Sequence, residues 1–258
     1  MVDTVIQNLI NGALMGCIYA LITLGLSIIY GVMNVVNFAH GDFVMLSMYF
    51  TFWVGALLGF DAVATPVLTF PLLFLFGILA YYALIDRTLR HMYVTQIAVT
   101  VGLMTLLRAV AQMAWKAQPR ALPYSIIQGN IRIAGVTIML SRLITAGVSI
   151  LAIVGVYLFL TKTWPGRAIR AASDDLDAAS LTGVNYKRTY ALAFGLGSAL
   201  TALAGLGSIP GLLITGVIVG GTEALTMSLW DPRARSLIVY LIFVLVLWLK
   251  PRGLFGRK

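Results

Sequence analysis

The sequence predicts an all-α, polytopic membrane protein with about seven to eight transmembrane or re-entrant helices. Of its 258 residues, 60% are hydrophobic and only 10% are charged, whereas soluble domains are about a quarter charged and under half apolar. The apolar runs also approach the roughly 20 residues that a membrane-spanning helix needs, and they lack the alternation of barrel strands. We expect a single transmembrane domain over residues 1–258.

Eight apolar segments follow one another along the chain, each near the length that crosses a bilayer. They are Leu9 to Val32, Phe43 to Leu58, Val63 to Ile85 (interrupted by Pro66 and Pro71), Val94 to Trp115, Leu143 to Leu160, Thr189 to Leu206, Ile209 to Met227 and Arg235 to Leu249. Gly195 and Gly197 in the sixth segment indicate close helix packing, with a broken segment lining a path as the alternative. Gly207 to Gly211, with Pro210, favours a break.

The loops between these segments predict orientation. Cations follow the third and fifth segments, and parity places both loops on one side of the membrane, with the loop 116–142 on the other. The excess of cations favours the side of the segment 162–188 as cytoplasmic, and the loop 116–142 as extracytoplasmic. Within that loop, residues 125–139 are typical of a short β-hairpin. The net charge of +9 fits contact with the anionic lipid bilayer and no nucleic acid.

The basic tail conflicts with this parity. Three crossings after the fifth segment would place Lys250, Arg252, Arg257 and Lys258 outside, although cations favour the inside. Either one of the last three segments does not cross, or a crossing element is missing near Leu206 and Gly207.

Asn37, His40 and Asp42 form a polar segment between the first two apolar runs. The absence of an accompanying nucleophile or set of metal ligands argues against a catalytic His40–Asp42 pair, and His91 is the only other histidine. Two interpretations remain: Asp42 caps the next helix, or the segment borders a translocation path. Arg108 and Gln112 lie in the fourth segment, where we expect the arginine to snorkel towards the bilayer surface.

The run from Gly166 to Gly183 is the most charged helix-prone stretch of the chain. It carries Arg167, Arg170 and Asp177 beside Ala178 and Ala179, and a glycine such as Gly183 commonly ends a helix. The chain has no Walker motif, so it does not bind ATP through a P-loop, and we expect no cofactor, no metal site and no enzymatic activity. A charged surface on the cytoplasmic side predicts a docking site for a cytoplasmic partner, with a solvated amphipathic helix as the alternative.

Three motifs together resemble the branched-chain amino-acid ABC transporter permeases of the LivH type. They are the run from Gly25 to Met33 leading into Asn37–Asp42, the segment Gly166 to Ala171 with Asp177, Ala178, Ala179, Gly183 and Asn185, and Lys250 to Gly256 at the end. The second resembles the coupling loop of that family. The sequence departs from the family near Leu206-Gly207, where relatives carry another long stretch, so the chain resembles an internally shortened member.

The resemblance implies a permease subunit of an importer in the bacterial inner membrane. Its partners would be a second related permease, two cytoplasmic ATPase subunits that bind the ATP, and a periplasmic solute-binding protein. It also implies that Asp177, Ala178, Ala179 and Gly183 belong to the helix that inserts into an ATPase. The solute would be a branched-chain or related amino acid; the alternatives are urea or short amides, or a structural subunit that does not transport.

Overall fold

The computed structural model describes the whole chain except residues 1, 60–63, 90, 116–128, 134–135 and 204–258. The described helices and strands are α1 (Val2–Met33), α2 (His40–Leu58), α3 (Pro66–Ala80), a π-helical turn η1 (Tyr81–Ile85), α4 (Asp86–Thr88), α5 (Tyr93–Trp115), β1 (Asn130–Ile133), β2 (Val136–Met139), α6 (Leu140–Lys162), α7 (Trp164–Asp174), α8 (Leu176–Leu181) and α9 (Tyr186–Leu203). The all-α fold class is confirmed, with one small hairpin added.

Five helices of the described part are long and apolar enough to cross a membrane. They coincide with the first five predicted segments, and α9 coincides with the sixth. The prolines do not interrupt the third segment as expected: Pro66 stands in the first turn of α3, where its missing N–H is not needed, and Pro71 is accommodated inside the helix. The predicted seventh and eighth segments lie outside the described residues.

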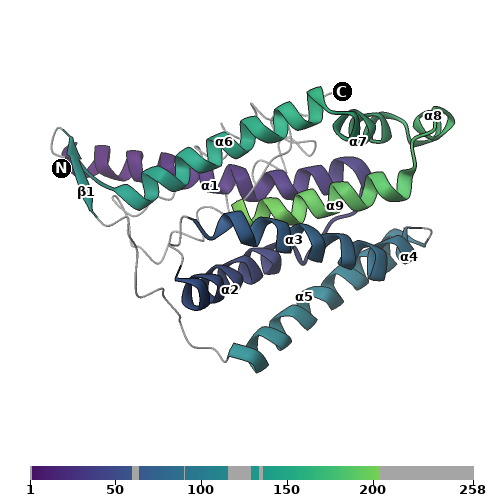
Figure 1. The fold of residues 1–258 in the computed structure, drawn as a ribbon, viewed down its shortest axis with the longest axis horizontal. Helices are drawn as coiled ribbons and strands as arrows, with labels where there is room; N and C mark the ends of the chain where they lie inside the picture. Colours follow the sequence, from purple (N-terminus) through teal and green to yellow (C-terminus); the bar gives the residue numbers. More distant parts are fainter. Residues whose placement is uncertain (1, 60–63, 90, 116–128, 134–135, 204–258) are drawn as a thin grey trace.

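Helix α9 lies between α1 and α3 and packs against both (Figure 1). Glycines make this possible. A β-carbon on Gly197 would lie 2.6 Å from the carbonyl oxygen of Gly25 in α1, and one on Gly77 of α3 would lie 2.6 Å from the Ser198 side chain. Small residues let helix backbones approach closely in lipid, so the packing interpretation of Gly195 and Gly197 is confirmed.

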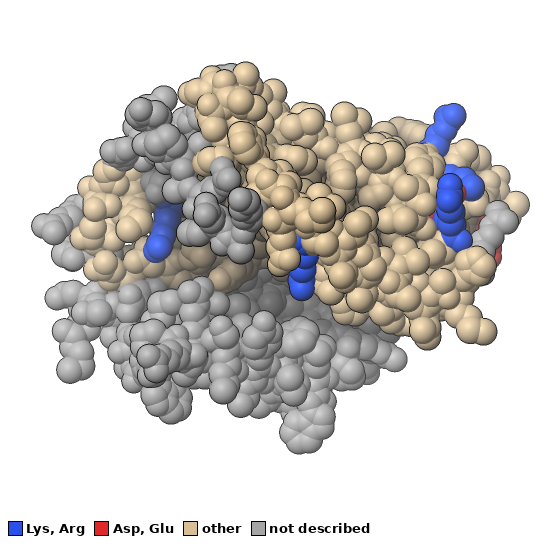
Figure 2. Space-filling view, turned by 90° about the horizontal axis from the view of Figure 1, so that it is seen from below, with Lys and Arg blue, Asp and Glu red and all other residues tan. Residues whose placement is uncertain are grey.

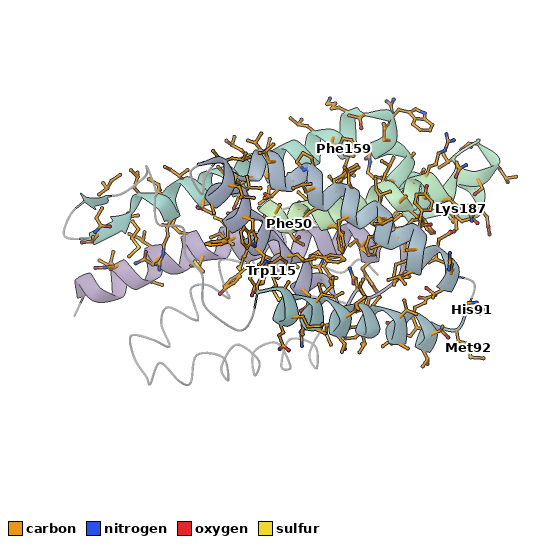
Figure 3. All side chains as sticks on the ribbon, turned by 60° about the horizontal axis from the view of Figure 1, so that its bottom comes forward. Phe50, His91, Met92, Trp115, Phe159 and Lys187 are labelled. Atoms are coloured by element: carbon orange, nitrogen blue, oxygen red, sulfur yellow. The ribbon has the colours of Figure 1, made fainter. Side chains whose placement is uncertain are left out.

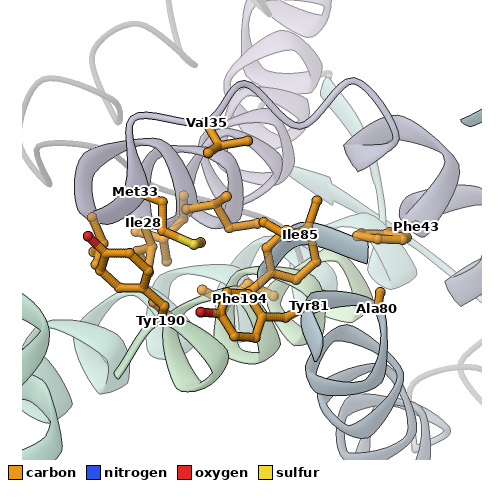
Figure 4. Close-up of a cluster of buried hydrophobic side chains, with 14 of the residues drawn as sticks. Ile28, Met33, Val35, Phe43, Ala80, Tyr81, Ile85, Tyr190 and Phe194 are labelled. Carbon is orange, nitrogen blue, oxygen red and sulfur yellow. The ribbon is translucent and has the colours of Figure 1, made fainter. Parts of the chain in front are cut away.

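Aromatic side chains fill the core beside this crossing (Figure 4). Phe43 of α2, Tyr81 of η1 and Phe194 of α9 are completely buried. The Phe194 ring centroid lies 6.1 Å from that of Phe43 and 6.3 Å from that of Tyr81, within the range of favourable ring contacts. The described core therefore joins helices that are far apart in the sequence.

The two ends of the helix bundle carry different loops. At one end Lys187, in the first turn of α9, donates to Asp86 of α4 at 2.9 Å, and α7 and α8 lie at the same end (Figures 1 and 3). At the other end the hairpin β1–β2 lies near the start of α1, where Arg142 donates to Asn11 at 3.2 Å. The described parts of the three loops lie at the ends that the parity predicts, and the hairpin is confirmed, although residues 125–128 and 134–135 of its predicted range lie outside the described residues.

Charge is also distributed unevenly between the ends. In the face shown in Figure 2, Lys and Arg side chains gather at the end occupied by α4, α7 and α8 in Figure 1, and only isolated ones interrupt the uncharged surface elsewhere. By the positive-inside rule this distribution favours the α7–α8 end as cytoplasmic.

Candidate functional site

Helices α7 and α8 form a short hairpin, and its entry from α6 is fixed by local sequence. The Thr163 side chain caps α7 by accepting a hydrogen bond from the Gly166 amide at 3.1 Å, and Pro165 occupies the first turn of α7. Gly166 is buried against the last turn of α6, where a β-carbon would collide with the backbone of Phe159 and Leu160. Gly166 therefore sets the sharp angle between α6 and α7.

Helix α7 has one face against the bundle and one in the open. Ala168, Ile169 and Ala172 are buried, whereas Arg167 and Arg170 are exposed. Ser173 donates to the Gly31 carbonyl oxygen at the end of α1, with a distance of 2.8 Å. This hydrogen bond and the buried face anchor α7 to the transmembrane helices, so a force on its arginine face would be transmitted to α1.

Helix α8 is defined by a cap at each end. Asp175 accepts from the Ala178 amide at 3.0 Å, which satisfies an amide of the first turn. At the other end the Val184 amide bonds the Ala179 carbonyl at 3.2 Å and the Gly183 amide bonds that of Ser180 at 3.1 Å, the pairing of a Schellman motif. Gly183 has φ +87°, so the prediction that it ends the helix is confirmed.

The predicted coupling residues divide into two groups. Arg167, Arg170, Asp177, Ala178 and Gly183 are exposed, and Leu181 beside them is 91% exposed. Gly166 and Ala179 are buried. The hairpin thus offers a mixed charged and apolar surface, while the two buried residues hold its shape and do not reach that surface.

The polar segment from Asn37 to Asp42, which includes the first turn of α2, is buried inside the bundle. Asn37, His40 and Asp42 are 2%, 4% and 4% exposed. The His40 Nε2 atom donates to the Ile22 carbonyl oxygen at 2.9 Å, and Asn37 Oδ1 accepts from the Ala39 amide at 3.1 Å. Among the described residues, Asn37 Nδ2 and His40 Nδ1 are buried without a hydrogen-bond partner.

This segment lies beside the middle of α1. Ile22 precedes the end of α1 at Met33 by about 11 residues, which is roughly 16 Å of helix. Because His40 is the first residue of α2 and contacts Ile22, α2 begins about halfway along the candidate span Leu9–Met33 of α1. The chain therefore turns back alongside α1 after Met33, before α2 begins.

Asp42 does not cap α2, contrary to one of the two interpretations. The N-cap residue is Ala39 and makes no side-chain cap. Asp42 instead pairs with Arg108 of α5, with 2.7 Å from Nε to Oδ1 and 3.4 Å from Nη2 to Oδ2. We expected Arg108 to snorkel towards the bilayer surface; the structure shows its guanidinium bonded to Asp42, with the side chain 57% exposed. Sequence reasoning missed the pair, although two opposite charges in separate apolar segments are a signal that could have found it.

Comparisons with known proteins identify the family. Residues 8–206 match the family described as "Branched-chain amino acid transport system / permease component". The chain is 27% identical to the high-affinity branched-chain amino acid transport system permease protein BraD of Pseudomonas aeruginosa, with 98% of this chain and 96% of the relative aligned. It is 29% identical to LivH of Salmonella typhimurium and 27% identical to LivH of Escherichia coli, with the same shares aligned. No solved structure matches the chain.

The alignments also bear on the predicted shortening. The alignment with BraD extends over 294 positions, and this chain has 258 residues, so at least 36 positions (294 − 258) are gaps in this chain. The family match ends at residue 206, next to the predicted junction at Leu206-Gly207, which itself lies outside the described residues. Such a family contains multi-pass membrane permeases and not enzymes. The chain belongs to the family of permease components of branched-chain amino acid transport systems.

Proposed function

We propose that this chain is the membrane-spanning permease subunit of an ABC importer that moves branched-chain or related amino acids across the bacterial inner membrane. Membership of the permease family carries the proposal, and the α7–α8 hairpin supports it. The partners are a second related permease, two cytoplasmic ATPase subunits that bind ATP, and a periplasmic solute-binding protein.

The α7–α8 hairpin is the proposed ATPase-docking surface. The exposed charges of Arg167, Arg170 and Asp177 would fix the position of the bound ATPase. The small side chain of Ala178 would let the backbone of the ATPase approach closely. Gly166 and Ala179 support the surface from behind, and Gly183 closes α8. Because Ser173 bonds Gly31, a movement of the hairpin reaches the end of α1 directly.

The segment from Asn37 to Asp42 is the proposed border of the translocation path. Polar groups at membrane depth are costly unless they face protein or water. This segment places a carboxylate, an imidazole and an amide beside the middle of α1, and Asp42 binds the exposed side chain of Arg108. The buried residues Asn37 and His40 position the segment, and Asp42 connects it to the surface of α5.

The test is solute uptake by the assembled importer. The full chain, expressed with its partner subunits in a host without branched-chain amino acid uptake, is expected to restore uptake of radiolabelled leucine. If excess urea or acetamide reduced this uptake and excess valine did not, the result would instead indicate an importer of small amides. Complex assembly without uptake of any of these solutes would overturn the transport proposal and favour the shortened structural subunit, which the alignment gap of at least 36 positions supports.

Docking is tested by co-purification of the ATPase subunits. Asp177→Arg reverses a charge on the exposed face of α8 and is expected to abolish co-purification. The matched control is Asn130→Arg, which adds an arginine to the exposed hairpin at the opposite end of the bundle. Unchanged co-purification with Asp177→Arg would rule out this surface.

A further inference from the structure

The exposed surface of α5 is divided into a polar and an apolar stripe. Thr105, Arg108 and Gln112 are exposed and spaced by three and four residues, so they lie along one side of the helix. Leu106, Val110 and Met113 are 56%, 48% and 85% exposed and have the same spacing along the other side. The buried face, with Leu103, Leu107 and Ala111, lies between them.

Lipid is a suitable neighbour for only one of these stripes. Leu106, Val110 and Met113 are as apolar as lipid tails. The polar stripe carries a charged side chain that is 57% exposed, and Arg108 is about seven residues, or roughly 10 Å, from the nearer end of α5. A cation facing hydrocarbon within a spanning helix is costly on insertion scales. Intramembrane charges therefore face the bundle interior or a water-filled cavity.

The ion pair with Asp42 does not explain the exposure of Arg108. Asp42 is nearly buried, with 6% of its side chain exposed, and it engages the guanidinium from the protein side through Nε and Nη2. A guanidinium has more N–H donors than these two bonds use, and its planar fork matches a carboxylate. The pair thus fixes the cation at one position, and the remaining donors belong to a side chain that is 57% exposed.

We propose that the polar stripe Thr105–Arg108–Gln112 lines the aqueous translocation path, and that Arg108 binds the carboxylate of the passing amino acid. The inference rests on the proposed function and adds the solute-facing residues to it. The segment Asn37–Asp42 then acts as a support: it keeps Asp42 behind Arg108, while Thr105 and Gln112 extend the polar surface one turn in each direction. The apolar stripe of α5 faces lipid or the partner permease.

Cysteine labelling in the assembled importer tests the lining. Cys17 is the only cysteine and is first replaced by serine. Thr105→Cys and Gln112→Cys are then compared with Leu106→Cys and Met113→Cys, which lie at similar depths on the other stripe. Because a thiol reacts as a thiolate, which needs water, a membrane-impermeant methanethiosulfonate is expected to label the polar-stripe cysteines at least tenfold faster. Equal rates, or labelling only when the chain is purified without its partners, would overturn the inference.

Ligand protection tests the carboxylate contact. Leucine and 4-methylvalerate, which both carry a carboxylate, are expected to slow the labelling of Thr105→Cys, whereas isoamylamine, which lacks one, does not. Adding Arg108→Gln is expected to remove the protection, and Arg108→Lys to retain part of it. Equal protection by isoamylamine, or none by leucine, would contradict the role of Arg108. Labelling does not need transport. A protein that fails in uptake but shows the expected labelling and protection would therefore contradict the proposed function and still support the role of Arg108.

Discussion

Gly25 of α1 and Gly197 of α9 bring the backbones of two helices into direct contact. A β-carbon on Gly197 would lie 2.6 Å from the Gly25 carbonyl oxygen and 2.7 Å from the Ile29 side chain. In a bilayer, helices associate through close van der Waals packing and interhelical hydrogen bonds, because lipid is as apolar as their side chains. This contact therefore fixes α9, which lies at the centre of the described bundle.

We expect Gly197→Ala to destabilise the protein by roughly 1–3 kcal/mol, the usual cost of overpacking a tight core. The measurement is thermal unfolding of the purified chain in detergent. The control is Gly147→Ala in α6, where a β-carbon would meet nothing within 4 Å. If both variants unfolded at the same temperature as the unsubstituted chain, the contact would not limit stability.

His40 should link α2 to α1 through its hydrogen bond to the Ile22 carbonyl, where Nε2 lies 2.9 Å from the oxygen. We expect His40→Ala to cost about 1–3 kcal/mol, because it removes a buried donor and leaves a space beside Gly25. His40→Gln keeps a donor and should cost less. Denaturant titration followed by helical circular dichroism distinguishes them, and an order of stability with alanine above glutamine would contradict this role.

The fold was largely predictable because hydrophobic length alone locates membrane-spanning helices. The first five segments and the hairpin near Gly135 were found from apolar runs and β-branched residues. The start of α2 was not. The second apolar segment was predicted to begin at about Phe43, whereas the helix begins at His40, whose side chain bonds the Ile22 carbonyl oxygen of α1. Hydropathy cannot reveal where this helix starts. The start depends on a tertiary contact, the hydrogen bond between the His40 side chain and the Ile22 carbonyl oxygen.

The candidate site was predictable only where the signal is local. Gly183 could be assigned as a helix end because a Schellman motif depends only on residues that are close in the sequence. The pairing of Asp42 with Arg108 had only a general signal, the presence of two opposite charges, because the residues are 66 positions apart and tertiary packing brings them together. The same limit applies to Gly166 and Ala179, whose burial depends on α6 and the rest of the bundle and not on the pattern within the hairpin.

The ion pair between Lys187 and Asp86 should make a small contribution that depends on salt. The lysine and aspartate side chains are 47% and 17% exposed, and exposed pairs are typically worth about 0.2–1 kcal/mol. A double-mutant cycle with Lys187→Met and Asp86→Asn is expected to give a coupling energy in this range. It should fall between 50 mM and about 1 M NaCl, where the Debye length shrinks to roughly 3 Å. Coupling that persists in high salt would mean that the pair is shielded from water.

Gly183 should control the stability of α8 without affecting the bundle. Its φ of +87° lies in the left-handed region, which costs a residue with a β-carbon roughly 1–2 kcal/mol. We therefore expect Gly183→Ala to open the Schellman motif more often, so that the Val184 amide, bonded to the Ala179 carbonyl, exchanges its hydrogen about 5–30 times faster. Gly183→Asn should show a smaller increase because asparagine tolerates this conformation. Hydrogen exchange in detergent measures the amide, and thermal unfolding checks that the bundle is unchanged. Equal exchange in all three proteins would show that the glycine conformation does not hold α8.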